Sequence, residues 1–118
     1  MESINLELKA SDSTANPYLA LAGVILAGLD GVERGLVPPE PAPRDPVLLT
    51  PEQQAACGIR PLPASQAEAL DALERDALLM EGLGDLMSRA YLATRRAENA
   101  TCLARGDDWA RLATFSTF

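Results

Sequence analysis

Three polar residues, Asn5, Glu7 and Lys9, alternate with aliphatic residues near the start of the chain. A period of two is typical of a half-buried strand and would place these three side chains on one face of it. Because a strand holds its side chains in fixed register, such a triplet suits a metal or anion site. One carboxylate cannot hold a magnesium ion, which prefers about six oxygen ligands. The pattern therefore predicts either a solvated face of a sheet or a site to which Glu7 contributes one ligand among several.

Two further pairs of adjacent charged residues are candidates for ion binding. Arg95 and Arg96 could bind an anion, but such a pair also commonly lies on the exposed side of a helix, where Glu98 would offset part of its charge. Asp107 and Asp108 could bind a cation, yet adjacent carboxylates after a glycine more often form a charged turn. The spacing alone favours a solvated surface over a functional site for both pairs.

Composition makes several classes of function poor candidates. The chain has 118 residues, of which 47% are hydrophobic, and 10 basic against 17 acidic residues give a net charge of −7. This length predicts one domain, and the acidic balance disfavours nucleic acid and anionic membrane surfaces as partners. Histidine is absent, and Cys57 and Cys102 are too few and too far apart for a zinc site. Both thiols are expected to be small packing residues, so a self-contained catalytic site based on histidine or cysteine is not predicted.

No targeting or membrane segment is evident in the sequence. The first residues lack the basic start and apolar run of a signal peptide. The most apolar stretch, residues 18–29, is shorter than the roughly 20 residues of a membrane span, and two glycines interrupt it. We therefore expect a cytoplasmic chain whose thiols are reduced.

A buried helix is predicted after the N-terminal strand. Asn16-Pro17 has the residue types expected at the N-cap and first position of a helix, which would run to about Leu29. The dipeptide Asp30-Gly31 supplies the predicted end, since glycine tolerates a positive φ. This helix is apolar almost all round, so it is expected to be buried on most sides, with Tyr18 in the core.

Proline-rich bridges separate the later elements. Residues 37–46 contain five prolines, which predicts an extended connector in place of helix or sheet, and residues 60–63 form a second bridge. Between the bridges, Thr50 and Gln53 have the spacing of a capping box for a short helix that ends at Gly58.

Two longer helices are predicted beyond the second bridge. Ser65 and Glu68 form another capping box, and the helix that they open would continue to the glycines at 82 and 84. Asp85 can cap a last long helix ending near Gly106, and no element is predicted for residues 109–118. The expected fold class is mainly α (an α+β fragment), with a short N-terminal strand followed by about four helices joined by proline-rich bridges.

One block of sequence resembles a known family. The segments Glu7-Leu8-Lys9, Asp12 to Ala22 (which includes Ala-Asn-Pro-Tyr-Leu) and Ala27-Gly28-Leu29-Asp30-Gly31 resemble the glutamine synthetase catalytic domain near its C-terminal end. The later order is also similar, with the helix from Ser65 to Leu73 and with Tyr91-Leu92 leading to Arg95-Arg96. In detail the chain looks closest to the branch that includes the fungal FluG and plant nodulin-type proteins.

The resemblance implies an ATP-dependent carboxylate–amine ligase that joins glutamate to ammonia or another amine, with Mg²⁺ or Mn²⁺ and ATP as cofactors. By this resemblance Glu7 falls on a metal-ligating position, and Lys9 falls on a position where an arginine commonly contacts the substrate. A lysine there keeps the charge but lacks the planar fork. Asn5 falls where ammonia-using members often have an arginine near the phosphates, which implies altered chemistry or substrate.

The resemblance also implies that residues 1–118 are a single C-terminal segment of that catalytic domain, with the N-terminal β-grasp domain and most of the active-site barrel absent. Phosphoryl transfer needs metals, phosphate clamps and a nucleophile assembled together, so we expect no catalytic residue here and no activity of the chain alone. The alternative is an independent helical assembly or binding module that has lost catalysis. The expected partners are a second copy or a separately encoded N-terminal half, and neither nucleic acid nor membrane.

Overall fold

The computed structural model of the chain describes residues 7–11 and 15–115. The chain divides into two compact units, Met1–Leu36 and Val37–Phe118, which are taken in turn below. The described residues form six α helices and one 3₁₀ helix and no strand, so the mainly helical prediction is confirmed. Within that described part, no helix is both long and apolar enough to cross a membrane.

The predicted N-terminal strand is not seen where the structure describes the chain. Residues 4–6 lie outside the described residues, and residues 7–11 contain a turn at Lys9 and Ala10. The amide of Ser11 donates a hydrogen bond of 3.5 Å to the carbonyl oxygen of Leu8, which closes this turn. A strand needs neighbouring strands to pair its backbone groups, and the described residues offer none, so the two-residue period alone cannot produce one.

Helix α1 (Pro17–Glu33) begins as its sequence predicts. The side chain of Asn16 accepts hydrogen bonds from the backbone amides of Tyr18 at 3.0 Å and Leu19 at 3.2 Å. Two of the amide groups that a helix start leaves unpaired are thereby satisfied, and Pro17 removes a third.

The end of α1 was predicted wrongly. The helix continues through Gly31 and ends beside Gly35, whose φ is +61°. The amide of Gly35 donates to Val32 O at 3.1 Å, and that of Leu36 donates to Gly31 O at 2.9 Å. These two bonds form a Schellman motif, which satisfies the last carbonyl groups and needs the positive φ at Gly35, not at Gly31.

The expected burial of α1 is not observed either. None of its residues is buried, and Tyr18, placed in the core by the sequence, is 83% exposed. The physical reason is that the described part of the first unit holds no second helix or strand against which α1 could pack.

The second unit starts with the predicted extended segment. The described backbone from residue 37 to residue 45 forms no helix or strand, and a single 3₁₀ turn, η1 (Pro46–Leu48), follows. Helix α2 (Pro51–Ala56) carries the predicted capping box, in which Thr50 Oγ1 accepts from the Gln53 amide at 3.3 Å and Gln53 Oε1 accepts from the Thr50 amide at 3.0 Å. Gly58, with a φ of +68°, ends the turn after it, as predicted.

The next predicted helix is two helices. Helix α3 (Gln66–Arg75) ends at Asp76, and helix α4 (Ala77–Leu83) begins there, because Asp76 Oδ1 accepts from the Leu79 amide at 3.0 Å and acts as a new N-cap. The start of α3 is as predicted, with Ser65 Oγ accepting from the Glu68 amide at 3.2 Å. Glu68 reaches back to the Ala64 amide at 2.9 Å, one residue earlier than a capping box requires.

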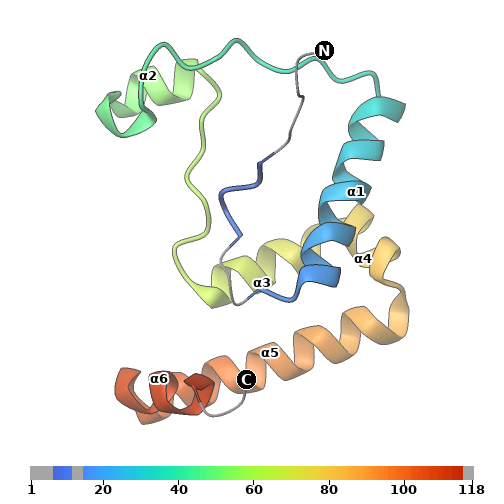
Figure 1. Ribbon diagram of the computed structural model, residues 1–118, viewed down its shortest axis with the longest axis vertical. Coiled ribbons are helices and arrows are strands. Elements are labelled where there is room, and N and C mark those ends of the chain that lie inside the picture. Colours follow the sequence, from blue (N-terminus) through green and yellow to red (C-terminus); the bar gives the residue numbers. More distant parts are fainter. Residues whose placement is uncertain (1–6, 12–14, 116–118) are drawn as a thin grey trace, which may run out of the picture. The chain divides into compact units, whose positions relative to one another are not determined.

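Helix α5 (Asp85–Arg105) ends at Gly106 as expected, but Gly84, not Asp85, is its N-cap residue. Helix α6 (Asp107–Phe115) follows in a tail for which no element was predicted. Figure 1 shows α5 leading directly into α6. Helix α5 packs against α3, α4 and α6, and the buried residues of the described chain are Leu49, Leu70, Ser88 and Leu92.

Candidate functional site

Glu7 and Lys9 form an ion pair, although they lie on a turn and not on the predicted strand. Lys9 Nζ is 2.6 Å from Glu7 Oε2, and both side chains are well exposed, at 85% for Lys9 and 60% for Glu7. Asn5, the third member of the predicted triplet, lies outside the described residues. The structure therefore gives an exposed ion pair on a turn, in which both charges face solvent.

This pair does not by itself fit a magnesium ion. Mg²⁺ prefers about six oxygen ligands in near-octahedral geometry, and Glu7 supplies one carboxylate that already contacts an ammonium group. Within residues 7–11 and 15–115, no group of three or more His, Cys, Asp or Glu side chains is placed to hold a metal ion. A metal bound through Glu7 would need ligands from beyond the described residues.

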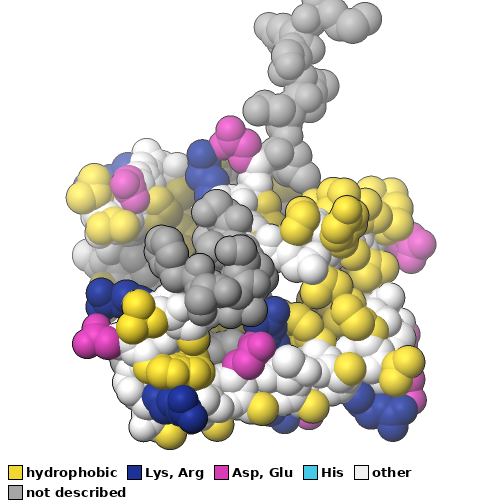
Figure 2. Space-filling view, turned by 60° about the horizontal axis from the view of Figure 1, so that its bottom comes forward, with side chains coloured by type: hydrophobic (Ala, Val, Ile, Leu, Met, Phe, Trp, Pro, Cys, Tyr) yellow, Lys and Arg dark blue, Asp and Glu magenta, His cyan; other side chains and the backbone are white. Residues whose placement is uncertain are grey.

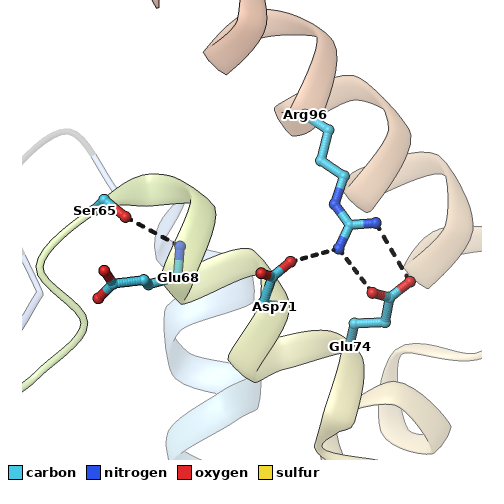
Figure 3. Close-up of polar contacts among 5 residues, drawn as sticks. All are labelled: Ser65, Glu68, Asp71, Glu74 and Arg96. Atoms are coloured by element: carbon cyan, nitrogen blue, oxygen red, sulfur yellow. Dashed lines mark hydrogen bonds and ion pairs between the residues drawn. The ribbon is translucent and has the colours of Figure 1, made fainter.

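Arg96 joins α5 to α3 through two carboxylates (Figure 3). Its Nη2 lies 2.9 Å from Asp71 Oδ1 and 2.7 Å from Glu74 Oε2, and its Nη1 lies 3.4 Å from Glu74 Oε1. The hydrogen bonds and charge of Glu74, then those of Asp71, raise the pKa of the Arg96 guanidinium above its usual value. Because this group is already paired twice, it is not an open anion receptor.

Arg95 is paired within its own helix. Its Nη1 lies 2.7 Å from Glu98 Oε2, and its guanidinium lies 5.6 Å from the centre of the Tyr91 ring. The prediction that Glu98 offsets part of the charge of this pair is confirmed. Arg95 and Arg96 therefore contact different partners, and they do not converge on one anion site.

A groove of about 640 Å³ follows α5 and α6 and was not predicted. Its lining includes Arg95 and Glu98 at one part and Cys102, Trp109 and Ala113 at another. The Arg105 guanidinium lies 4.9 Å from the centre of the Trp109 ring. The signal that could have revealed it is the helical spacing of Trp109, Ala110 and Ala113, which places these three residues on one face.

The remaining candidates occupy structural positions. Asp107 and Asp108 lie in the first turn of α6, where the helix dipole favours acidic residues, so the predicted charged turn is a helix start. Cys57 and Cys102 are free thiols of intermediate burial. Glu52 lies in the first turn of α2, where hydrogen bonds from its own backbone amide and from the Thr50 hydroxyl lower the pKa of its carboxyl group.

Comparison with known proteins identifies the family. The family model described as "Glutamine synthetase, catalytic domain" matches residues 1–113. The chain belongs to this family. It is 43% identical over 104 residues to the gamma-glutamylpolyamine synthetase of Streptomyces coelicolor, and this match covers 88% of the chain and 22% of that relative. It is 37% identical over 108 residues to the glutamine synthetase of Methanocaldococcus jannaschii, covering 92% of the chain and 24% of that relative.

The glutamine synthetase of Thermus thermophilus is 40% identical over 92 residues, which are 78% of the chain and 21% of that relative. The chain thus spans about a fifth of the length of the curated relatives that it matches. The resemblance seen in the sequence is confirmed at the level of the glutamine synthetase family, and the finer placement in the FluG and nodulin-type branch stays a prediction.

Proposed function

We propose that residues 1–118 supply one C-terminal segment of the catalytic domain of an ATP-dependent carboxylate–amine ligase. The observation that carries this proposal is the family match over residues 1–113, which includes the Glu7–Lys9 pair. In this proposal the ligase joins the carboxylate of glutamate to an amine, in the cytoplasm, where ATP is available.

Each residue of the N-terminal pair has a proposed role in the assembled domain. Glu7 is one ligand of a divalent cation, Mg²⁺ or Mn²⁺, whose other ligands come from elsewhere in the domain. The bound cation would neutralise charge on the phosphates of ATP. Lys9 and Asn5 contact the substrate, and the exposure of Glu7 and Lys9 leaves both side chains accessible to the rest of the domain. Lys9 provides a point charge where an arginine would grip a carboxylate with two parallel hydrogen bonds.

We further propose that the chain alone is inactive. A phosphoryl transfer requires the metal ions, the phosphate contacts and the nucleophile in one place. The described residues bring together one carboxylate and one ammonium group at the candidate site. This is the reason to expect that ATP, the metal and glutamate act only in an assembled enzyme.

Two amines are candidates for the substrate that is joined to glutamate. The Streptomyces relative is named a gamma-glutamylpolyamine synthetase, while the other two relatives are named glutamine synthetases. Asn5, in place of a family arginine, supports an acceptor other than ammonia. Both ammonia and a polyamine such as spermidine therefore belong in the assay.

The test is a chimera in which this chain replaces the matching 104 residues of the Streptomyces relative. We expect the chimera to release phosphate only when ATP, glutamate and an amine are all present. Glu7→Gln should lower that rate by at least about tenfold, since it removes a charged ligand from the cation. The matched control is Glu40→Gln, which removes an exposed carboxylate from the proline-rich segment and should leave the rate unchanged.

The outcomes separate the parts of the proposal. Phosphate release by the isolated chain under the same conditions would overturn its inactivity. Equal rates for the Glu7→Gln and Glu40→Gln chimeras would remove Glu7 from the metal site. A chimera that folds but has no activity with either amine would contradict the ligase role.

The second candidate function is an independent helical assembly module. The observation that favours it is α1, which is apolar and carries no buried residue in the described structure. This candidate needs neither a metal ion nor ATP.

A further inference from the structure

We draw no further inference here: the strongest candidate, the groove of about 640 Å³ along α5 and α6 beside Trp109, has Arg95 and Glu98 of its lining already paired with each other, and nothing in the structure shows what covers it or the hydrophobic side chains exposed on the face drawn in Figure 2.

Discussion

A single guanidinium group joins the two helices that bury Leu70 and Leu92. Arg96 reaches from α5 to Asp71 and Glu74 of α3, which lie 25 and 22 residues earlier in the chain. Contacts between residues this far apart in the sequence help to fix how one helix lies on another, whereas an ion pair within a helix does not. The three side chains are about half exposed, so solvent and salt weaken their attraction.

We therefore predict a modest, salt-dependent effect of Arg96→Met. The thermal midpoint should fall by a few degrees at low salt, and the difference from the unmodified chain should shrink at high salt because the lost interaction is electrostatic. Thermal unfolding by circular dichroism at two salt concentrations measures this.

The matched control is Arg89→Met, which breaks contacts with Asp85 inside α5, namely an ion pair of 3.1 Å and a hydrogen bond of 3.2 Å from Arg89 Nε to the Asp85 carbonyl oxygen. We expect it to change the midpoint less than Arg96→Met, since it does not link two helices. An equal effect of the two variants would show that the Arg96 contacts add nothing beyond a local pair.

At the scale of single elements, the two glycines near the end of α1 provide a direct test of where the helix stops. Gly31 lies inside the helix and Gly35 has a φ of +61°, and an added Cβ would meet no atom within 4 Å at either position. Packing therefore cannot decide the effect of alanine, and only the backbone conformation can.

Gly31→Ala should stabilise α1 by about 0.5–1 kcal/mol, because alanine loses less conformational freedom in a helix than glycine does. Gly35→Ala should destabilise the helix end by about 1–2 kcal/mol, because a Cβ is disfavoured at positive φ. Amide hydrogen exchange along α1 measures both changes. If Gly31→Ala weakened protection instead, the helix would end where the sequence pattern had placed its stop.

The sequence predicted the starts of α1, α2 and α3, but not the starts of α4 and α6, the N-cap of α5 or the end of α1. Asn16, Thr50 and Ser65 all act as predicted, because an N-cap depends on residues at most three positions away. Asp76 was missed because the apolar spacing continues across it, although its side chain can compete with the helix backbone. A period of two alone could not establish the N-terminal strand, because a strand is stable only when partner strands pair with it.

At the candidate site too, contacts between residues close in the sequence were easier to predict than contacts between different helices. Glu7 and Lys9 were predicted to share one face of a strand, and the structure instead pairs them on a turn, while their roles in a site stay a prediction. The partners of Arg96 come from another helix, so local spacing could not predict them, whereas the spacing of Trp109, Ala110 and Ala113 was a local signal from which the groove could have been predicted.

At the scale of the whole molecule, the described residues bury few side chains. The buried hydrophobic residues among them are Leu49, Leu70 and Leu92. Burial of apolar surface is the main favourable term in folding, so the described residues, with so small a core, have little stability to lose. Much of its apolar surface, including that of α1, is available to a partner, which agrees with membership of a family whose relatives are several times longer.

Removal of one core side chain should therefore unfold the second unit. Replacing a buried leucine with alanine costs about 2–5 kcal/mol, which is comparable to the whole stability expected here. Leu92→Ala, at a position that is 6% exposed, should abolish most of the urea-dependent helical transition seen by circular dichroism. Leu103→Ala, on the same helix but 78% exposed, removes the same atoms from a solvated position and should leave the transition in place. If Leu92→Ala kept a cooperative transition at an unchanged urea midpoint, the helices α3 to α5 would have to be held by contacts other than their shared core.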